Sequence, residues 1–403
     1  MPIKLSRYIL LFVPFFLLFY SEALELGGVT ISQLWKLPLF GYLIYYLFQH
    51  RHLHTHIWSQ VQYWSSLKNM INAAGVSGFM VNVLAAVKFA FMPLLFNYMN
   101  NKSWNVSTLR KVLLVISQYF VLTNIPFLLG IKTQKTGVDY GDFVAYSGIF
   151  QNQHAMSVIM AICIIVILNE FKQGIFPNLL SKLYNIALIA LAGYAMYLGF
   201  ARTGWLMCFL AIIVLYLPRG IRIKQWLSIT LVITLLMGGF SYLFTANQHF
   251  HDRLVGNDLQ THQRVNFDSG RSQYISIALD RYVHGTVPEL LIGVSYSEVT
   301  SVMKQKTGMA IGAHNGFVDM LVNNGAIGIG LMLFFAFSLL VFILRRKRMP
   351  TFRLAMAMWV MYISFQTTQG GCMFHSDFLY ALIYCILEKE YRQEDEIKKL
   401  EEC

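Results

Sequence analysis

Apolar runs of about twenty residues recur along most of the chain, and each is long enough to cross a bilayer as a helix. Within lipid, every backbone N–H and C=O must be satisfied inside the segment itself, so runs of this length indicate helices. They lie near residues 6–24, 30–48, 75–98, 111–130, 146–170, 184–200, 203–218, 226–245, 324–345, 351–368 and 373–388. Only 13% of the residues are charged, whereas soluble domains carry roughly a quarter. We therefore predict an all-α polytopic membrane protein with about 11–12 transmembrane helices.

Basic residues beside the apolar runs predict the orientation of the chain, because Lys and Arg concentrate in cytoplasmic loops. The clusters beginning at Arg345 and Arg219 are therefore expected in the cytoplasm. Working outward from them, Arg202 and the long polar segment 246–313 face the periplasm. The formal net charge of +12 lies mostly in such short segments, so it does not indicate a nucleic-acid partner.

The first third of the chain does not fit this count. Eleven spans with a cytoplasmic tail place Met1 outside, although Lys4 and Arg7 favour the inside. A weak twelfth crossing near 57–74 would resolve the conflict, and twelve is the favoured number. The alternating histidines from His50 to His56 could bind a metal, but no other ligand cluster accompanies them, so an interfacial polar loop is favoured.

We predict one integral domain in four parts. Residues 1–245 form the N-terminal transmembrane helices, and residues 246–313 form one large periplasmic loop with short helices. Residues 314–388 form the C-terminal transmembrane helices, and residues 389–403 form a solvated cytoplasmic tail. The loop is too short and too polar to hold a large core alone, so we expect it to cap the bundle.

His314 and Asn315 precede the apolar run near 324–345. Histidine is the side chain best suited to proton transfer near neutral pH, and a membrane span does not require one. If one helix runs through, Gly325 and Gly328 lie about three and four turns below His314, on a stripe that lets a neighbouring helix pack closely. A satisfied interfacial histidine above an ordinary glycine packing motif is the other interpretation.

A third interpretation concerns Asn323 and Asn324, which come directly before Gly325. These two residues could break the helix and leave His314 on a short re-entrant piece.

Three arginines are candidates for binding an anion. Arg202 lies in a short turn on the predicted periplasmic side, where positive-inside bias disfavours it; the alternative is snorkelling to lipid headgroups. Arg271 follows a turn signal and precedes a helical pattern, so its guanidinium and the free N–H groups of the helix start suit a phosphate. Arg281 is a weaker candidate of the same kind, and a solvated loop arginine is the alternative for both.

Amides precede the run that begins near residue 146. Gln151 and Asn152 could hydrogen-bond sugar hydroxyls as part of a substrate site, or could simply cap a helix. The polar run from Gln366 to Gly371, with His375 and Asp377, is similar and is interpreted mainly as a loop.

Four motifs together resemble the O-antigen ligase and polymerase superfamily of bacterial inner-membrane glycosyltransferases. His314-Asn315 with Gly325 and Gly328 is similar to the ligase signature, and the stretch from Arg202 to Leu206 is similar to an Arg-x-x-x-Leu element. The other two motifs are Ser269-Gly270-Arg271 and the stretch from Ser147 to Asn152. Gln153-His154 follows the last of these where many members have Pro-Asn, which weakens a functional role for that stretch.

The resemblance implies a membrane glycosyltransferase of the GT-C type fold, in the bacterial inner membrane with its active site facing the periplasm. The donor would be an undecaprenyl-pyrophosphate-linked glycan, and the acceptor a sugar hydroxyl on lipid A-core or on another lipid-linked repeat. His314 would be the general base, Arg271 and Arg202 would hold the pyrophosphate, and Asn315, Arg281, Asn152 and Gln151 would be substrate-binding candidates.

Such an enzyme would invert the anomeric centre and need no metal or cofactor, because pyrophosphate is already a good leaving group. Membrane lipids and a chain-length regulator are the further partners that the resemblance implies. Whether the chain is a polymerase or a ligase stays open. The alternatives are a flippase or carrier of lipid-linked oligosaccharides and a non-catalytic membrane protein of envelope assembly.

Overall fold

The computed structural model describes residues 25–26, 29–50, 56–73, 79–131, 144–150, 152–217, 238, 245, 271–294, 296–309, 311–371 and 373–401. The predicted run near 6–24 lies outside these residues, as do nearly all of the run near 226–245 and residues 246–270 of the predicted loop. Gln151 also lies outside them.

Helices form almost all of the regular structure in the described part of the chain, so the all-α prediction is confirmed there. The exception is a small antiparallel pair, β1 (Glu25–Leu26) with β2 (Val29–Thr30). The helices are α2 (Ile31–Gln49), α3 (Ile57–Ala73), α4 (Phe79–Asn101), α5 (Val106–Leu122), α6 (Ile125–Leu128), α7 (Gln153–Lys172), α8 (Leu179–Gly199), α9 (Arg202–Tyr216), α12 (Arg271–Val283), α13 (Val287–Ile292), α14 (Tyr296–Thr307), α15 (Gly316–Leu344), α16 (Phe352–Thr368) and α17 (Phe374–Glu401).

Four helical segments in the described part are long and apolar enough to cross a membrane: Val106–Leu128, Gln153–Lys172, Leu179–Gly199 and Gly316–Leu344. Lengths of 20 to 29 residues span the roughly 30 Å hydrocarbon core at 1.5 Å per residue. The chain is therefore an α-helical membrane protein.

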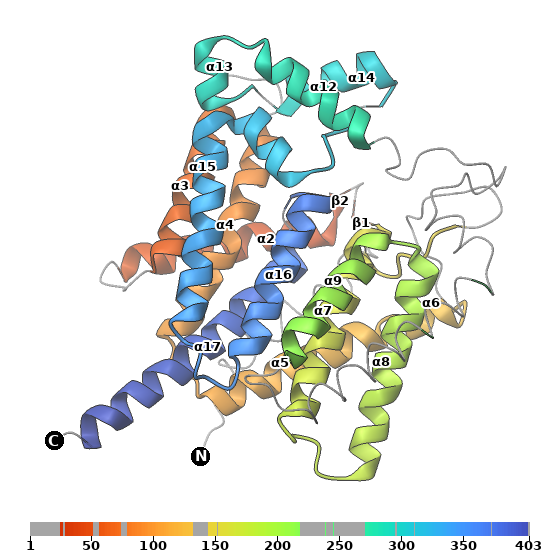
Figure 1. Cartoon of the computed structure of the whole chain (residues 1–403), viewed down its shortest axis with the longest axis vertical. Coiled ribbons are helices and arrows are strands. Elements are labelled where there is room, and N and C mark those ends of the chain that lie inside the picture. Colours follow the sequence, from red (N-terminus) through yellow and green to blue (C-terminus); the bar gives the residue numbers. More distant parts are fainter. Residues whose placement is uncertain are drawn as a thin grey trace.

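Helix α16 lies at the centre of the bundle. It packs against α9 and α7 on one side, against α15 on the other, and against α17. Figure 1 shows α3, α4 and α15 grouped on one side of α16, and α7, α8 and α9 on the other. One end of α16 is therefore reached by helices from widely separated parts of the sequence.

The region near 57–74, where a twelfth crossing was predicted, forms helix α3, which packs against α4 and α15. It is not among the apolar segments long enough to span. One of its polar side chains bonds the neighbouring helix: Asn97 of α4 donates from Nδ2 to Tyr63 Oη at 2.8 Å. This region is thus a helix packed within the bundle, and most of the stretch from His50 to His56, which was interpreted as a polar loop, lies outside the described residues.

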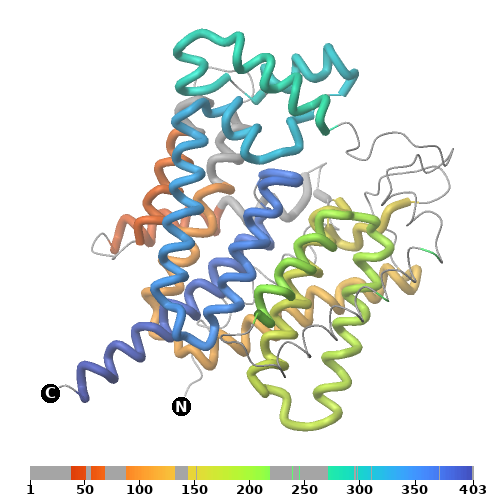
Figure 2. Tube along the Cα trace, in the orientation of Figure 1, coloured from red at the N-terminus to blue at the C-terminus, as the bar shows by residue number. Residues whose placement is uncertain are grey.

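Helices α12, α13 and α14 form a cap over one end of α15 (Figures 1 and 2). Arg281 of α12 holds the three together, because it donates from Nη2 to Glu289 of α13 at 2.6 Å and from Nε to Glu298 of α14 at 2.9 Å. A small apolar cluster lies beneath them and consists of Ala278, Val294, Val299, Met303, Ala313 and Val322.

Helix α15 is broken at Gly325, whose φ of 66° and ψ of −170° are not helical. The prediction of one continuous helix with Gly325 and Gly328 beneath His314 is therefore wrong, and the alternative of a break after Asn324 is correct. The break admits the end of α13: a Cβ on Gly325 would overlap the backbone of Leu291. Helix α15 also begins only at Gly316, so His314 lies before it.

Hydrogen bonds from neighbouring segments satisfy carbonyl groups beside this break. The N–H of Val294 donates to the carbonyl of Val322 at 2.9 Å, which replaces a bond that an unbroken helix would make. Lys68 of α3 donates from Nζ to the carbonyl of Ile292 at 2.8 Å. Gly328 packs within α15 itself, since its nearest neighbour is the side chain of Asn324.

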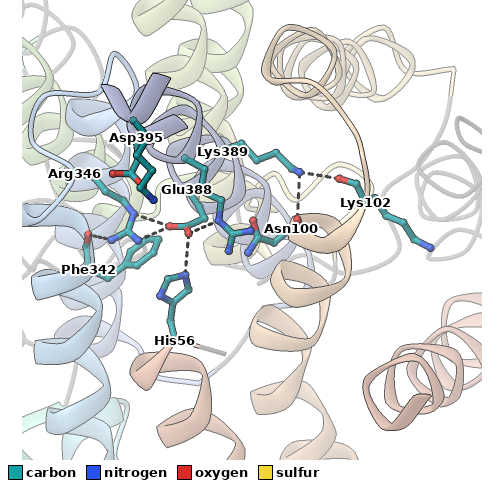
Figure 3. A network of polar contacts seen from close by, with 10 residues as sticks. His56, Asn100, Lys102, Phe342, Arg346, Glu388, Lys389 and Asp395 are labelled. Carbon is teal, nitrogen blue, oxygen red and sulfur yellow. Dashed lines mark hydrogen bonds and ion pairs between the residues drawn. The ribbon is translucent and has the colours of Figure 1, made fainter. Parts of the chain in front are cut away.

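The other end of the bundle is held by a buried carboxylate, Glu388, which is 3% exposed. Its Oε2 accepts from Arg346 Nε at 2.7 Å, its Oε1 accepts from Arg392 Nε at 2.8 Å, and His56 Nε2 lies 3.4 Å from Oε1. Figure 3 shows the carboxylate between Arg346 and His56. Buried charges persist when they are paired in this way.

The predicted boundary between residues 388 and 389 is therefore not a structural one. Helix α17 continues through it to Glu401, and Glu390 is also buried, at 8% exposed. Thr351 donates to Glu390 from both Oγ1 and its backbone N–H. From residue 391 onward the helix is exposed or half-buried, and its ion pairs are local, such as Lys398 with Glu394 and Lys399 with Asp395.

Candidate functional site

The C-terminal end of α16 collects side chains from four other elements. They come from the start of α12, the segment before α15, the start of α7 and the start of α9. Their contacts centre on Thr367, Thr368 and Gln369. A helix C-terminus leaves carbonyl groups without intrahelical partners and carries partial negative charge, so it attracts N–H donors and cations.

Arg271, the first residue of α12, donates from Nη1 to the carbonyl oxygen of Thr368 at 2.6 Å. The guanidinium is half-buried, and the partial negative charge of the helix end stabilises it there. A guanidinium carries five N–H donors in a planar fork, so this bond sets the direction of the fork.

His314 lies beside Arg271 and has an unusual backbone. Its φ is +54°, in the left-handed region that non-glycine residues rarely occupy. Such strain persists where the surroundings impose it, and it concentrates at functional sites. The imidazole is half-buried, and the ring of Tyr274 on α12 lies 6.0 Å from it between centroids.

The surroundings of His314 favour the neutral imidazole. Burial lowers the pKa of His314 below its ordinary value of 6.5, and the positive charge of Arg271 lowers it further. A hydrogen bond with the Gln369 side chain opposes these effects in part, and the net direction is downward. Near neutral pH the ring is therefore unprotonated, which is the form that can accept a proton.

Asn315 joins the start of α15 to the end of α16. Its Oδ1 accepts from the backbone N–H groups of Phe317 and Val318, which makes it the N-cap of α15. Its Nδ2 donates to the carbonyl of Thr367 at 3.0 Å. Asn315 therefore has a structural role that fixes the segment carrying His314.

Two glycines bring these segments into backbone contact. Gly370 has a φ of +76°, and a Cβ there would lie 2.6 Å from both N and Cα of Gly316. A Cβ on Gly316 would in turn overlap the side-chain oxygen of Gln366. The close approach holds His314, two residues before Gly316, next to Gln369.

Gln369 contacts both sides of the site. Its Nε2 donates to Nδ1 of His154 on α7 at 3.1 Å and lies 3.5 Å from Oγ1 of Thr203 on α9. One amide thus connects the end of α16 to the starts of α7 and α9.

Arg202 begins α9, one residue before Thr203, and is half-buried. The turn that places it is tight: Phe200 ends α8 with a φ of +50°, and Ala201 follows as the N-cap of α9. Gly204 then lets α9 approach α7, because a Cβ there would overlap Ser157. The structure therefore places the start of α9 at the same end of the bundle as His314.

Two other sequence candidates, Asn152 and Arg281, have structural partners. Asn152 is the N-cap of α7, with Oδ1 accepting from the N–H of Ala155 at 2.8 Å. Gln153 is 3% exposed, and its Oε1 has no hydrogen-bond partner among the described residues. Arg281 belongs to the cap clamp, where its two carboxylate partners raise its pKa, and it lies about 15 Å along α12 from Arg271.

Gln369 and His154 were not predicted as site residues. Gln369 lay in a polar run interpreted as a loop, and His154 was noted only as a departure from the family pattern. The available signal was that two polar stretches, 151–154 and 366–371, both border apolar runs at the end of the bundle that carries His314.

The site thus combines a neutral imidazole with a guanidinium held beside it. Such a pair can accept a proton from a hydroxyl and stabilise negative charge on a phosphate oxygen. Within the described ranges, no group of three or more His, Cys, Asp or Glu is placed to hold a metal ion.

Comparisons with protein-family models and with curated proteins find no match to this chain.

Proposed function

We propose that this membrane protein is a glycosyltransferase that moves an undecaprenyl-pyrophosphate-linked glycan onto an acceptor sugar hydroxyl at the periplasmic face of the bacterial inner membrane. The acceptor is another lipid-linked repeat or lipid A-core, and the fold is then of the GT-C type. One observation carries the proposal: His314 and Arg271 meet at the end of α16, where Arg271 bonds Thr368 and helps to keep the imidazole neutral.

The chemistry follows from these two groups. His314 accepts the proton of the acceptor hydroxyl while that oxygen forms a bond to the anomeric carbon of the donor. The bond from the anomeric carbon to the pyrophosphate oxygen breaks, and its electron pair leaves with the pyrophosphate. Attack opposite the leaving group inverts the anomeric centre. His314 then releases the proton to water.

Arginines stabilise the leaving group. Arg271 places a permanent positive charge beside His314, and Arg202 begins α9 at the same end of the bundle. A guanidinium fork matches phosphate oxygens in shape as well as charge. Removal of one such donor from a comparable site costs about 100- to 1,000-fold in rate.

The experiment compares surface polysaccharide in cells that carry wild type, His314→Ala or Arg271→Ala. Single-repeat glycan on lipid A-core indicates loss of a polymerase, and long polymer left on undecaprenyl pyrophosphate indicates loss of a ligase. His284→Ala is the matched control, because His284 lies on the cap with its side chain 77% exposed. Normal capped glycan in both site variants would refute the proposal.

A further inference from the structure

Apolar side chains of the cap form an exposed face on helix α13. Val287, Leu291 and Ile292 are all exposed, and Val287 is exposed by 69%. Positions 287 and 291 are four residues apart, so they project from the same face of the helix. Exposed apolar patches mark sites of contact with protein or with membrane. The depth of α13 in the molecule indicates which of the two applies here.

The charged residue of α13 is directed away from this face. Glu289 is two positions from both Val287 and Leu291, which places it on the opposite side of a helix. There it accepts from Arg281 Nη2 at 2.6 Å and from the backbone N–H of Thr286 at 2.6 Å. Helix α13 is therefore amphipathic, with its polar side bound to the cap and its apolar side directed outward, as in helices that lie at a membrane surface.

The break in α15 coincides with a boundary of the membrane. From Ala326 to Leu344 the chain carries no charged residue, and the basic cluster that begins at Arg345 follows directly. At 1.5 Å per residue this stretch extends roughly 28 Å, which matches the hydrocarbon core of about 30 Å. Gly325 therefore lies where the hydrocarbon core ends on the side of the cap.

Contacts with two helices fix α13 at that depth. A Cβ on Gly325 would overlap the backbone of Leu291, and Lys68 of α3 donates from Nζ to the carbonyl of Ile292 at 2.8 Å. Figure 1 shows α13 at the ends of α3 and α15. The six residues of α13 extend about 9 Å, and the headgroup layer is roughly 5–8 Å deep in each leaflet. Helix α13 therefore lies at the level of the headgroups.

The apolar face of α13 is continuous with exposed apolar side chains of the bundle. Trp64 lies four residues before Lys68 on α3, so it shares the face of Lys68 one turn away, and it is exposed. Ile327 lies two residues after Gly325 at the start of the apolar stretch of α15, and it is exposed as well. Trp is enriched where a membrane meets water. A bilayer around the bundle therefore reaches the face of α13.

We infer that α13 anchors the cap in the headgroup layer of the lipid leaflet on that side of the membrane, with Val287, Leu291 and Ile292 as its lipid contacts. The bilayer that surrounds the bundle supplies the apolar surroundings of these side chains, and no second protein is needed. The inference is independent of the proposed transferase activity, because it rests on the depth and the polarity of α13.

Spin labels test the depth of α13 in the full-length protein, in vesicles of phosphatidylethanolamine and phosphatidylglycerol. Labels are attached at Leu291→Cys, at Ile327→Cys within the span and at His284→Cys, a cap position with its side chain 77% exposed. The background carries Cys372→Ser and Cys403→Ser, because the other three cysteines are buried. The labels at 291 and 327 should be more accessible to oxygen, which dissolves in lipid, than to a water-soluble nickel complex. The label at 284 should show the reverse order.

Val287→Asp tests whether the apolar face holds the cap in place. A carboxylate on this face favours water over the membrane, so the accessibility of the Leu291 label to the nickel complex should rise several-fold. Gln305→Asp is the matched control, because it makes the same change of charge at an exposed position of α14. It should leave the Leu291 label unchanged.

Three results would overturn the inference. If the label at 291 is as accessible to the nickel complex as the label at 284, α13 lies in water. If the label at 291 is accessible to neither reagent, protein covers the face, either a second copy of the chain or another of its segments. If Val287→Asp leaves the label at 291 unchanged, the apolar face does not hold the cap.

Discussion

Arg271 donates from Nη1 to the carbonyl oxygen of Thr368 over 2.6 Å, although the two residues are 97 positions apart in the chain. The bond joins the first residue of the cap to the last residue of α16, and it places a permanent charge beside His314. The cap, the central helix and the candidate base are therefore coupled through one guanidinium.

The pH dependence of transfer should report the neutral form of His314. Because burial and Arg271 hold its pKa below 6.5, the unprotonated fraction rises as the pH passes upward through that lowered value. We expect kcat/KM to rise on the acid side with a midpoint below 6.5 and to be flat above about pH 7.5. A midpoint above 6.5 would contradict this account.

The same shift affects stability. Below pH 6.5 the unfolded chain binds more protons at His314 than the folded protein does. The free energy of unfolding is therefore highest above pH 6.5, as far as His314 is concerned, and it declines as the pH falls below that value. Thermal unfolding in detergent at pH 7.5 and at pH 5.5 should show part of this loss, and His314→Gln should reduce it.

Replacement of Arg271 should change both the rate and its pH profile. Arg271→Gln removes the charge that lowers the pKa of His314, so the acid midpoint should move upward toward 6.5. On the alkaline plateau the rate should fall about 100-fold, because charge on the departing pyrophosphate is no longer stabilised. Arg348→Gln, an exposed arginine in the loop after α15, should change neither quantity.

Gly316→Ala should damage the site through packing alone. A Cβ at this position would overlap the Gln366 side chain and lie 2.8 Å from Cα of Gly370, so the backbone must shift. We expect a loss of about 1–3 kcal/mol in unfolding free energy and slower transfer. Gly330→Ala is the matched control on the same helix, since nothing lies within 4 Å of its Cβ position. Equal behaviour of the two variants would show that the Gly316 contact is unimportant.

Arg281→Ala should loosen the cap. The guanidinium bonds both Glu289 and Glu298, and partly exposed pairs of this kind contribute about 1 kcal/mol or less each. Hydrogen exchange across 287–307 should accelerate while the bundle helices stay protected. The exposed Lys304→Ala should leave exchange unchanged. If Arg281→Ala also left it unchanged, the clamp would be irrelevant to cap stability.

Local features of the fold were predictable from the sequence because they depend on neighbouring residues. Most described residues of the apolar runs lie in helices such as α7 and α8, and the break at Asn324-Gly325 was one of the alternatives that the residues suggested. By contrast, the burial of Glu388 depends on Arg346 and His56, which are distant in sequence. No local pattern reveals such a pairing.

Some residues of the candidate site were predictable from the sequence and others were not. His314 and Arg271 stood out because a titratable ring and a guanidinium at the edge of a membrane span are costly without a purpose. Asn152 and Arg281 were also selected, and each has a structural partner that accounts for it. Gln369 was overlooked because its contacts with His154 and Thr203 form only when α7, α9 and α16 pack together.

The contact between α13 and the break in α15 restricts how this sequence can vary over time. A side chain at Gly293 would overlap the backbone between Asn323 and Asn324, and one at Gly325 would overlap the backbone of Leu291. Since each obstacle is main chain, no smaller neighbour can be substituted to make room. Neither position can therefore take a side chain without a shift of the backbone, and among descendants of this sequence that keep the cap in place, both should still be glycine.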